Sequence, residues 1–192
     1  MQVRVVADQP WDVQADVLAI PIVGEPAFGG PLAELNRRTG GELATLATFG
    51  ELRAKRYTSA LAAPGDLPAT RVVTISAGPA DALDRETVLH VGAAAEHRLG
   101  GRHARSLAIW LTPLDRIAGG LEAVAELVAR GVVEGSFEPR ALYRDRSEIS
   151  TAPPILEELI LIAPGADLGP LGRAAERGMI IGEGANHART LS

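Results

Sequence analysis

The sequence predicts an α/β domain in which helices cover both faces of a mixed β-sheet. Short apolar runs alternate with helical patterns through the second half of the chain, as in layered α/β folds. Glu158–Ala163 is almost continuously apolar, which is typical of a strand covered on both faces. A chain of 192 residues is long enough for one sizeable core, and no internal repeat or domain boundary is visible before its last segment.

The strands are expected at intervals along the whole chain. Gln2–Ala7 alternates in polarity, which places Val3 and Val5 on one face of a half-exposed strand. Val17–Val23 is a denser apolar run, and Pro21 within it predicts an edge position or a bulge. Three further strands are expected at Tyr57–Ala62, Arg71–Ser76 and Ser106–Leu111.

Helix signals lie between these strands. Pro31 can open a helix that runs through Arg38, because proline at a first helical position loses no hydrogen bond. Asp84 is a suitable N-cap for a helix that continues through Arg98. Two other helices are expected at Glu42–Thr48 and Gly120–Arg130, and the charged stretch Val132–Pro154 is interpreted as an irregular connection.

The final segment, Leu168–Ser192, has the pattern of a long helix with one very small face. That face consists of Leu171, Ala174, Ala175, Gly178, Ile181, Gly182, Ala185 and Ala188. Each of Gly178, Gly182 and Gly184 costs a helix about 1 kcal/mol relative to alanine, so close approach of another backbone should offset the cost. We expect that backbone to belong to a partner domain that is absent from this chain.

Two segments carry a family resemblance. Residues 177–192 resemble the connecting segment of the leucyl aminopeptidase (cytosol aminopeptidase) family, in which a helix leaves the N-terminal domain and enters the catalytic domain. The matching positions are Gly182, Asn186, Ala188, Arg189 and Leu191. Val133–Arg144 is similar to the family's glycine-then-aromatic stretch that ends in Tyr-Lys, with Arg144 in place of lysine.

The resemblance implies a three-layer macrodomain-like fold and a divided chain. Residues 1–168 would form the macrodomain-like N-terminal domain, and 169–192 the connecting helix towards a catalytic domain absent from this chain. The whole protein would remove N-terminal amino acids from peptides and assemble as a homo-hexamer. Its two divalent metal ions, zinc or manganese, would bind Asp, Glu and Lys side chains of the catalytic domain.

The resemblance also implies that this chain is not itself an enzyme. The family's metal-ligand segment, Asn-Thr-Asp-Ala-Glu-Gly-Arg, does not occur in it, and Lys55, its only lysine, lies in the wrong region to substitute. We therefore expect no catalytic, metal-binding or cofactor-binding residue in this chain. Its expected role is to support the catalytic domain and to contribute to the oligomer.

A second interpretation rests on Asp16–Gly40, which runs strand, glycine loop, helix. That order resembles the ADP-ribose-binding segment of macrodomains, where backbone amides and a helix N-terminus hold the diphosphate. Here Ile22-Val23 replaces the expected asparagines, and only Gly29-Gly30 remains of the glycine run. We favour kinship of fold without ligand binding, although binding at Gly24–Gly30 stays open, as does an autonomous hydrolase that uses unrecognised residues.

Composition and motifs exclude several other classes. The net charge of −5 and the 4% aromatic content argue against nucleic-acid and anionic-membrane partners. The absence of cysteine excludes disulfides and thiolate chemistry, and the N-terminus lacks the apolar core of a signal peptide, so a cytoplasmic location is expected. Phosphate-loop, dinucleotide, serine-hydrolase and zinc-protease motifs are all missing.

Three polar clusters are interpreted as ordinary surface. His90 and His97 could share one helix face, but two exposed histidines are the simpler explanation. The basic group of Arg102, His103 and Arg105 is expected to compensate the dipole at a helix end, with an anion site as the alternative. Glu157-Glu158 is expected to be a solvated strand entry, because adjacent side chains of a strand point to opposite faces.

Overall fold

A six-stranded mixed sheet organises the computed structural model, which describes residues 1–52, 55–100, 102–137 and 156–191. The strands lie in the order β1-β6-β5-β2-β4-β3, and all neighbours are parallel except β3 and β4. Their bounds are Gln2–Val6 (β1), Val17–Val23 (β2), Ser59–Ala62 (β3), Arg71–Gly78 (β4), Ser106–Trp110 (β5) and Glu158–Ile162 (β6).

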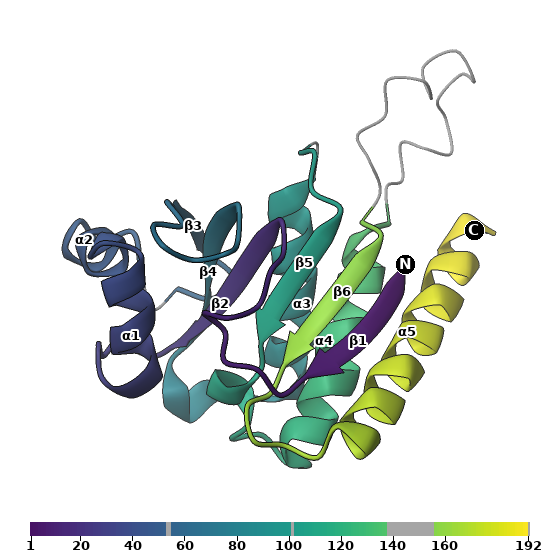
Figure 1. Ribbon diagram of the computed structural model, residues 1–192. Helices are drawn as coiled ribbons and strands as arrows, with labels where there is room; N and C mark the ends of the chain where they lie inside the picture. The colour runs from purple at the N-terminus through teal and green to yellow at the C-terminus, as the bar shows by residue number, and fades with distance from the viewer. Residues whose placement is uncertain (53–54, 101, 138–155, 192) are drawn as a thin grey trace.

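Helices cover both faces of the sheet, so the predicted three-layer α/β architecture is confirmed (Figure 1). One face carries α1 (Gly30–Arg38) and α2 (Glu42–Thr48). The other carries α3 (Arg85–Leu99), α4 (Gly120–Gly135) and α5 (Leu168–Thr190). Two short 3-10 helices, Ala80–Ala82 and Thr112–Leu114, follow β4 and β5.

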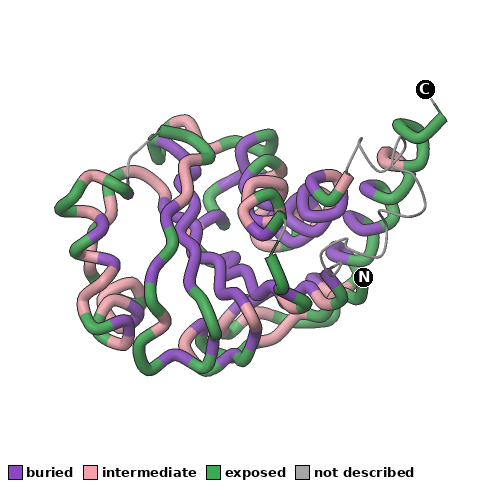
Figure 2. Tube along the Cα trace, turned by 90° about the horizontal axis from the view of Figure 1, so that it is seen from above, coloured by how far each residue is buried: buried purple, intermediate pink, exposed green. Residues whose placement is uncertain are grey.

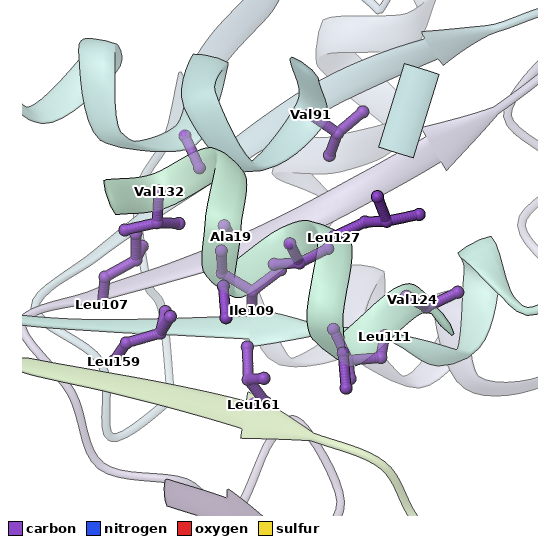
Figure 3. Close-up of a cluster of buried hydrophobic side chains, with 14 of the residues drawn as sticks. Ala19, Val91, Leu107, Ile109, Leu111, Val124, Leu127, Val132, Leu159 and Leu161 are labelled. Atoms are coloured by element: carbon purple, nitrogen blue, oxygen red, sulfur yellow. The ribbon is translucent and has the colours of Figure 1, made fainter. Parts of the chain in front are cut away.

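The strand β6 divides the core into two layers, as its apolar run predicts. Leu159 and Leu161 pack among the side chains of the α3–α5 layer, whereas Ile160 and Ile162 pack beneath α1 and α2. All four side chains are fully buried, and burial of such a side chain stabilises a fold by about 1.5–3 kcal/mol. Buried segments are prominent in the strands (Figure 2), and side chains of β5 and β6 meet those of α4 in the core (Figure 3).

The edge position, one of the two alternatives predicted for Pro21, is realised locally in β2. Its register with β5 runs from Val17 to Ala19, whereas its register with β4 continues to Val23. Pro21 therefore lies where the central strand has become a local edge, which suits a residue without an N–H donor. The register with β4 also shifts between Ile22 and Val23.

Several predicted boundaries differ from the structure by one or two residues, as at the end of β4, which reaches Gly78, and the end of α4 differs by more. The helix α4 continues to Gly135, so the first residues of the expected irregular connection are helical. Val132 is fully buried there and Gly131 lies against the Leu89 carbonyl of α3, so the apolar contact with α3 extends the helix. The strand β3 begins at Ser59 because Tyr57 has φ +65°, outside the strand region. The rest of the expected connection, 138–155, lies outside the described residues.

Candidate functional site at the junction of α4 and α5

The predicted small face of α5 exists, but its partner differs from the expectation. Its members Ala174, Ala175, Gly178 and Gly182 are buried. They pack against α4 of the same chain (Figure 1), not against a missing domain. The sequence had placed Ile181 and Ala188 on this face, yet both are exposed, Ile181 by 43%. The helix therefore has an inward face that belongs to this domain.

Two glycines bring the backbones of α4 and α5 together. A Cβ atom added at Gly178 would collide with the Glu126 carbonyl of α4, and one added at Gly182 would lie 2.7 Å from Val133 Cβ. Real Cβ atoms do not approach other atoms so closely, so these sites need glycine. Gly184 differs, because an added Cβ there would meet no atom within 4 Å.

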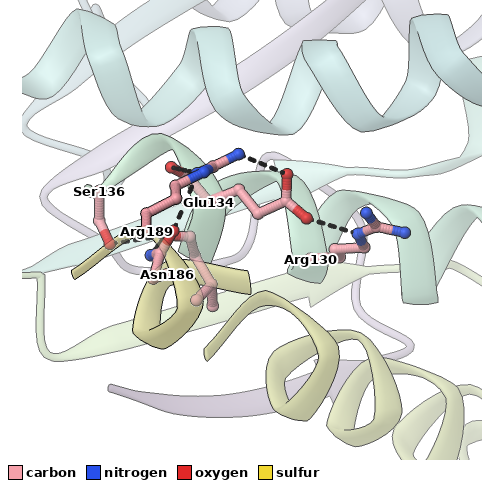
Figure 4. Close-up of polar contacts among 6 residues, drawn as sticks. Arg130, Glu134, Ser136, Asn186 and Arg189 are labelled. Atoms are coloured by element: carbon pink, nitrogen blue, oxygen red, sulfur yellow. Dashed lines mark hydrogen bonds and ion pairs between the residues drawn. The ribbon is translucent and has the colours of Figure 1, made fainter. Parts of the chain in front are cut away.

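The C-terminal half of α5 is joined to the end of α4 by polar contacts (Figure 4). Asn186 Nδ2 donates to the Val133 carbonyl at 2.6 Å, and Arg189 Nη1 donates to the Glu134 carbonyl at 3.3 Å. These are carbonyls of the last turn of α4, where helical partners run out. The Glu134 carboxylate also lies 2.6 Å from Arg130 Nε and 3.4 Å from Arg189 Nη2.

The two segments that carry the family resemblance meet at this junction. Asn186 and Arg189 come from the connecting segment, while Val133 and Glu134 begin the glycine-then-aromatic stretch. Arg189 also lies over the ring of Phe137, with its guanidinium carbon 5.8 Å from the ring centroid. These contacts hold the C-terminal half of α5 against the end of α4.

Sequence reasoning missed the part of α4 that receives α5. Glu134 pairs with Arg130 and Arg189, and both glycines on this part of the helix, Gly131 and Gly135, lie against the α3 backbone. The four-residue spacing of Gly131 and Gly135, the same as that of Gly178 and Gly182 in α5, could have revealed the close approach of α4 to α3, but not the contacts of α4 with α5.

The glycine loop that resembles a macrodomain ligand site lies between β2 and α1. Gly24 N–H donates to the Gly78 carbonyl at 2.7 Å, and Gly29 N–H donates to the Ala27 carbonyl at 2.8 Å. Two of the amides that could hold a diphosphate are therefore engaged within the chain. Added Cβ atoms at Gly29 and Gly30 would meet nothing within 4 Å, so the helix entrance itself is open.

His90 and His97 line an open hollow of about 610 Å³ on the outer side of α3. Tyr57 lies across from them, with its hydroxyl 3.4 Å from His90 Nδ1 and the two rings edge to face at 5.4 Å. Arg98 also lines the hollow. From the sequence alone the two histidines were interpreted as surface residues, and the position of Tyr57 beside His90 was not expected.

The other polar clusters serve the framework. Arg102 Nη1 donates to the Arg98 carbonyl at 2.7 Å, so it caps the end of α3 as the dipole interpretation expects. Glu158 pairs with Arg4 of the neighbouring strand at 2.6 Å. Glu157 lies 3.8 Å from Arg105, and both side chains are largely exposed.

Asp16 is a framework residue that sequence reasoning did not single out. Its carboxylate accepts hydrogen bonds from the Arg105 N–H at 2.7 Å and the Ser106 N–H at 3.0 Å. The Arg105 N–H is the main cause that lowers the pKa of this carboxyl below its ordinary value of 3.8. The Asp16 N–H in turn donates to Ser106 Oγ at 2.8 Å, so the starts of β2 and β5 are tied in both directions.

The part of the chain that the structure describes contains no group of three or more His, Cys, Asp or Glu side chains placed to hold a metal ion. Nor does any helix within it have the length and apolar character needed to cross a membrane.

Comparison with known proteins connects this architecture to a family of peptidases. Residues 22–144 match the N-terminal domain of the cytosol aminopeptidase family. A probable cytosol aminopeptidase of Roseiflexus castenholzii is 29% identical over 206 residues; the match covers all of this chain but 36% of that protein. The chain thus spans about a third of the length of this relative.

Solved structures extend the likeness to the fold. The bottromycin maturation enzyme BotP, in complex with Mn, is 25% identical with a TM-score of 0.63 over 92% of this chain and 31% of its own. A tomato leucine aminopeptidase mutant is 20% identical with a TM-score of 0.74 over 96% of this chain and 36% of its own. A Trypanosoma brucei macrodomain in complex with ADP is 14% identical with a TM-score of 0.63, over 90% of this chain and 68% of its own.

The last two likenesses show the fold alone, and they confirm the macrodomain-like architecture. The match to the family's N-terminal domain covers more than half of the chain, and it includes the α4 residues that receive α5. The chain belongs to the cytosol aminopeptidase family, of which it represents the N-terminal domain.

Proposed function

We propose that this chain is the non-catalytic N-terminal domain of a metal-dependent leucyl aminopeptidase, which removes N-terminal amino acids from peptides. The observation that carries the proposal is the junction itself. The residues that match the family's connecting segment, Asn186 and Arg189, hold α5 on the last turn of α4 at 2.6 and 3.3 Å. They give the helix one fixed direction, which suits an element that joins two domains.

The proposal places the two divalent ions expected of the family in the catalytic domain. The family's metal-ligand segment is missing from the whole sequence. We accordingly assign domain support and a contribution to a hexamer to residues 1–168, the connection to the catalytic domain to 169–192, and a cytoplasmic location to the protein.

The reading frame of the gene downstream of Ser192 tests this proposal. We expect it to continue with Asn-Pro-x-Asn and, further on, with the metal-ligand segment. Sedimentation of the full-length protein should then give a hexamer. A natural stop codon at Ser192, together with a stable monomeric chain, would contradict the assignment.

A second candidate function is an ADP-ribose- or nucleotide-binding module. It is favoured by the likeness to the Trypanosoma brucei macrodomain and by the open entrance of α1 at Gly29 and Gly30. The engaged amides of Gly24 and Gly29 argue against it. Titration calorimetry of the chain with ADP-ribose decides between the two: we expect no heat of binding at millimolar ligand, and saturable binding would establish the second function.

A further inference from the structure

The outward side of α5 carries an apolar stripe that nothing in the described chain covers. Ile180 is 68% exposed, Ile181 43% and Leu191 77%. Together with Gly184 and Ala188 these positions recur at spacings of three and four residues, so they share one side of the helix, on which the exposed His187 also lies. We define Ile180, Ile181, Gly184, Ala188 and Leu191 as the outer stripe. It lies opposite the Gly178 face that packs on α4.

The outer stripe is more than scattered surface hydrophobicity. Eight large apolar side chains are exposed among the described residues, and three of them, Ile180, Ile181 and Leu191, belong to the stripe. Isolated exposed apolar residues need no explanation, whereas contiguous ones mark interaction sites. Gly184 adds to this, because a glycine within a helix is unfavourable and no contact of the described chain requires it.

The α4–α5 junction holds the stripe in place before any partner binds. Asn186 and Arg189 fix the same turns of α5 that carry Gly184 and Leu191. Nearer the start of the helix, Arg177 pairs with Glu126 of α4 at 3.1 Å. A side chain on a helix anchored at both ends loses little further freedom on binding, which favours association.

We infer that the outer stripe is the docking surface for the domain that follows this one in the family, with Gly184 as the point of closest backbone approach. This inference rests on the proposed function. The matched family domain is N-terminal, so in a relative such as the Roseiflexus protein the remaining two thirds of the chain come after the region matched here. α5 is the last element among the described residues, and the outer stripe extends along its exposed side as far as its C-cap, Leu191.

Thiol labelling tests the inference, because the chain contains no cysteine of its own. Ile180→Cys and Leu191→Cys would be made in the 192-residue chain and in the full-length protein. Phe49→Cys serves as the matched control, since Phe49 is also an apolar side chain, is 77% exposed, and follows α2 on the opposite face of the sheet. The rate of maleimide labelling at each position would be followed by peptide mass analysis.

We expect all three variants of the isolated chain to label quickly. In the full-length protein, labelling of Ile180→Cys and Leu191→Cys should slow by on the order of tenfold or more, while Phe49→Cys should keep its rate. Equal rates in both proteins would overturn the inference, as would equal slowing at all three positions. Slowing in the isolated chain that grows with its concentration would assign the stripe to a second copy and would also overturn it.

Failure of the inference can be distinguished from failure of the proposed function. A full-length protein that hydrolyses a leucine amide, yet leaves Ile180→Cys fully reactive, would contradict only the docking surface. A gene that encodes no further domain would contradict the proposed function itself, and the docking surface with it.

Discussion

Replacing Gly178 by alanine adds one methyl group at the closest approach of α4 and α5. The new Cβ would collide with the Glu126 carbonyl and lie 2.9 Å from its carbon and 3.1 Å from the Arg130 nitrogen. All three are backbone atoms in the middle of α4, which cannot rotate away as a flexible side chain would. The two helices must therefore separate along part of their length.

The expected change in the free energy of unfolding is the difference between two opposing effects. Alanine favours a helix over glycine by about 1 kcal/mol. Overpacking of a close contact costs about 1–3 kcal/mol, and a backbone collision belongs at the upper end. We therefore expect Gly178→Ala to lower the free energy of unfolding by about 2 kcal/mol, which corresponds to a fall in Tm of roughly 4–8 °C for a domain of this size.

Gly184→Ala is the matched control on the same helix. An added Cβ there meets nothing within 4 Å, so only the helix-propensity term applies. We expect this variant to gain up to about 1 kcal/mol. Urea unfolding followed by circular dichroism measures both free energies in the isolated chain. If Gly178→Ala proved as stable as Gly184→Ala, the packing of α5 on α4 described above would be refuted.

Three further predictions concern the framework. Asn186→Ala removes the hydrogen bond to the Val133 carbonyl and should cost about 1 kcal/mol, with faster amide hydrogen exchange confined to the last turns of α5; unchanged exchange there would contradict the junction. Leu159→Ala empties a fully buried site of the α3–α5 layer and should cost about 2–5 kcal/mol in urea unfolding, whereas a loss below 1 kcal/mol would place Leu159 outside the core. The pKa of Asp16 is lowered in the folded chain, so its contribution to stability is present above the ordinary carboxyl pKa of 3.8 and is lost as the pH falls through the folded value. Asp16→Asn should therefore be less stable at neutral pH by about 1 kcal/mol and show a smaller loss of stability on acidification below pH 5, and parallel pH profiles of the two proteins would exclude this role.

Local sequence patterns, such as the periodicity of apolar side chains and the residues at helix ends, predicted much of the fold. The apolar run of β6, the Asp84 cap of α3 and the small face of α5 all follow from side-chain periodicity or from capping chemistry. The structure confirms the strand and the cap, including the 2.7 Å hydrogen bond from the Thr87 N–H to Asp84, and it confirms the small face of α5 except for Ile181 and Ala188, which are exposed. Pro21 was interpreted correctly because a missing N–H donor restricts a strand position wherever it occurs.

The errors arose where tertiary contacts decide. A glycine in a helix indicates a close approach, but the pattern does not identify the approaching backbone. For Gly178 and Gly182 that backbone is α4, which the sequence ended too early at Arg130. The position of Tyr57 beside His90 depends on a backbone conformation with φ +65°, which no local propensity of tyrosine predicts.

The assignment as a non-catalytic N-terminal domain is tested most directly by an aminopeptidase assay on two proteins. The isolated 192-residue chain and the full-length protein would be compared at equal molarity on a leucine chromogenic amide with added manganese or zinc. We predict turnover by the full-length protein and none by the isolated chain. Turnover by the isolated chain would contradict the account, because it would require a catalytic site among these residues.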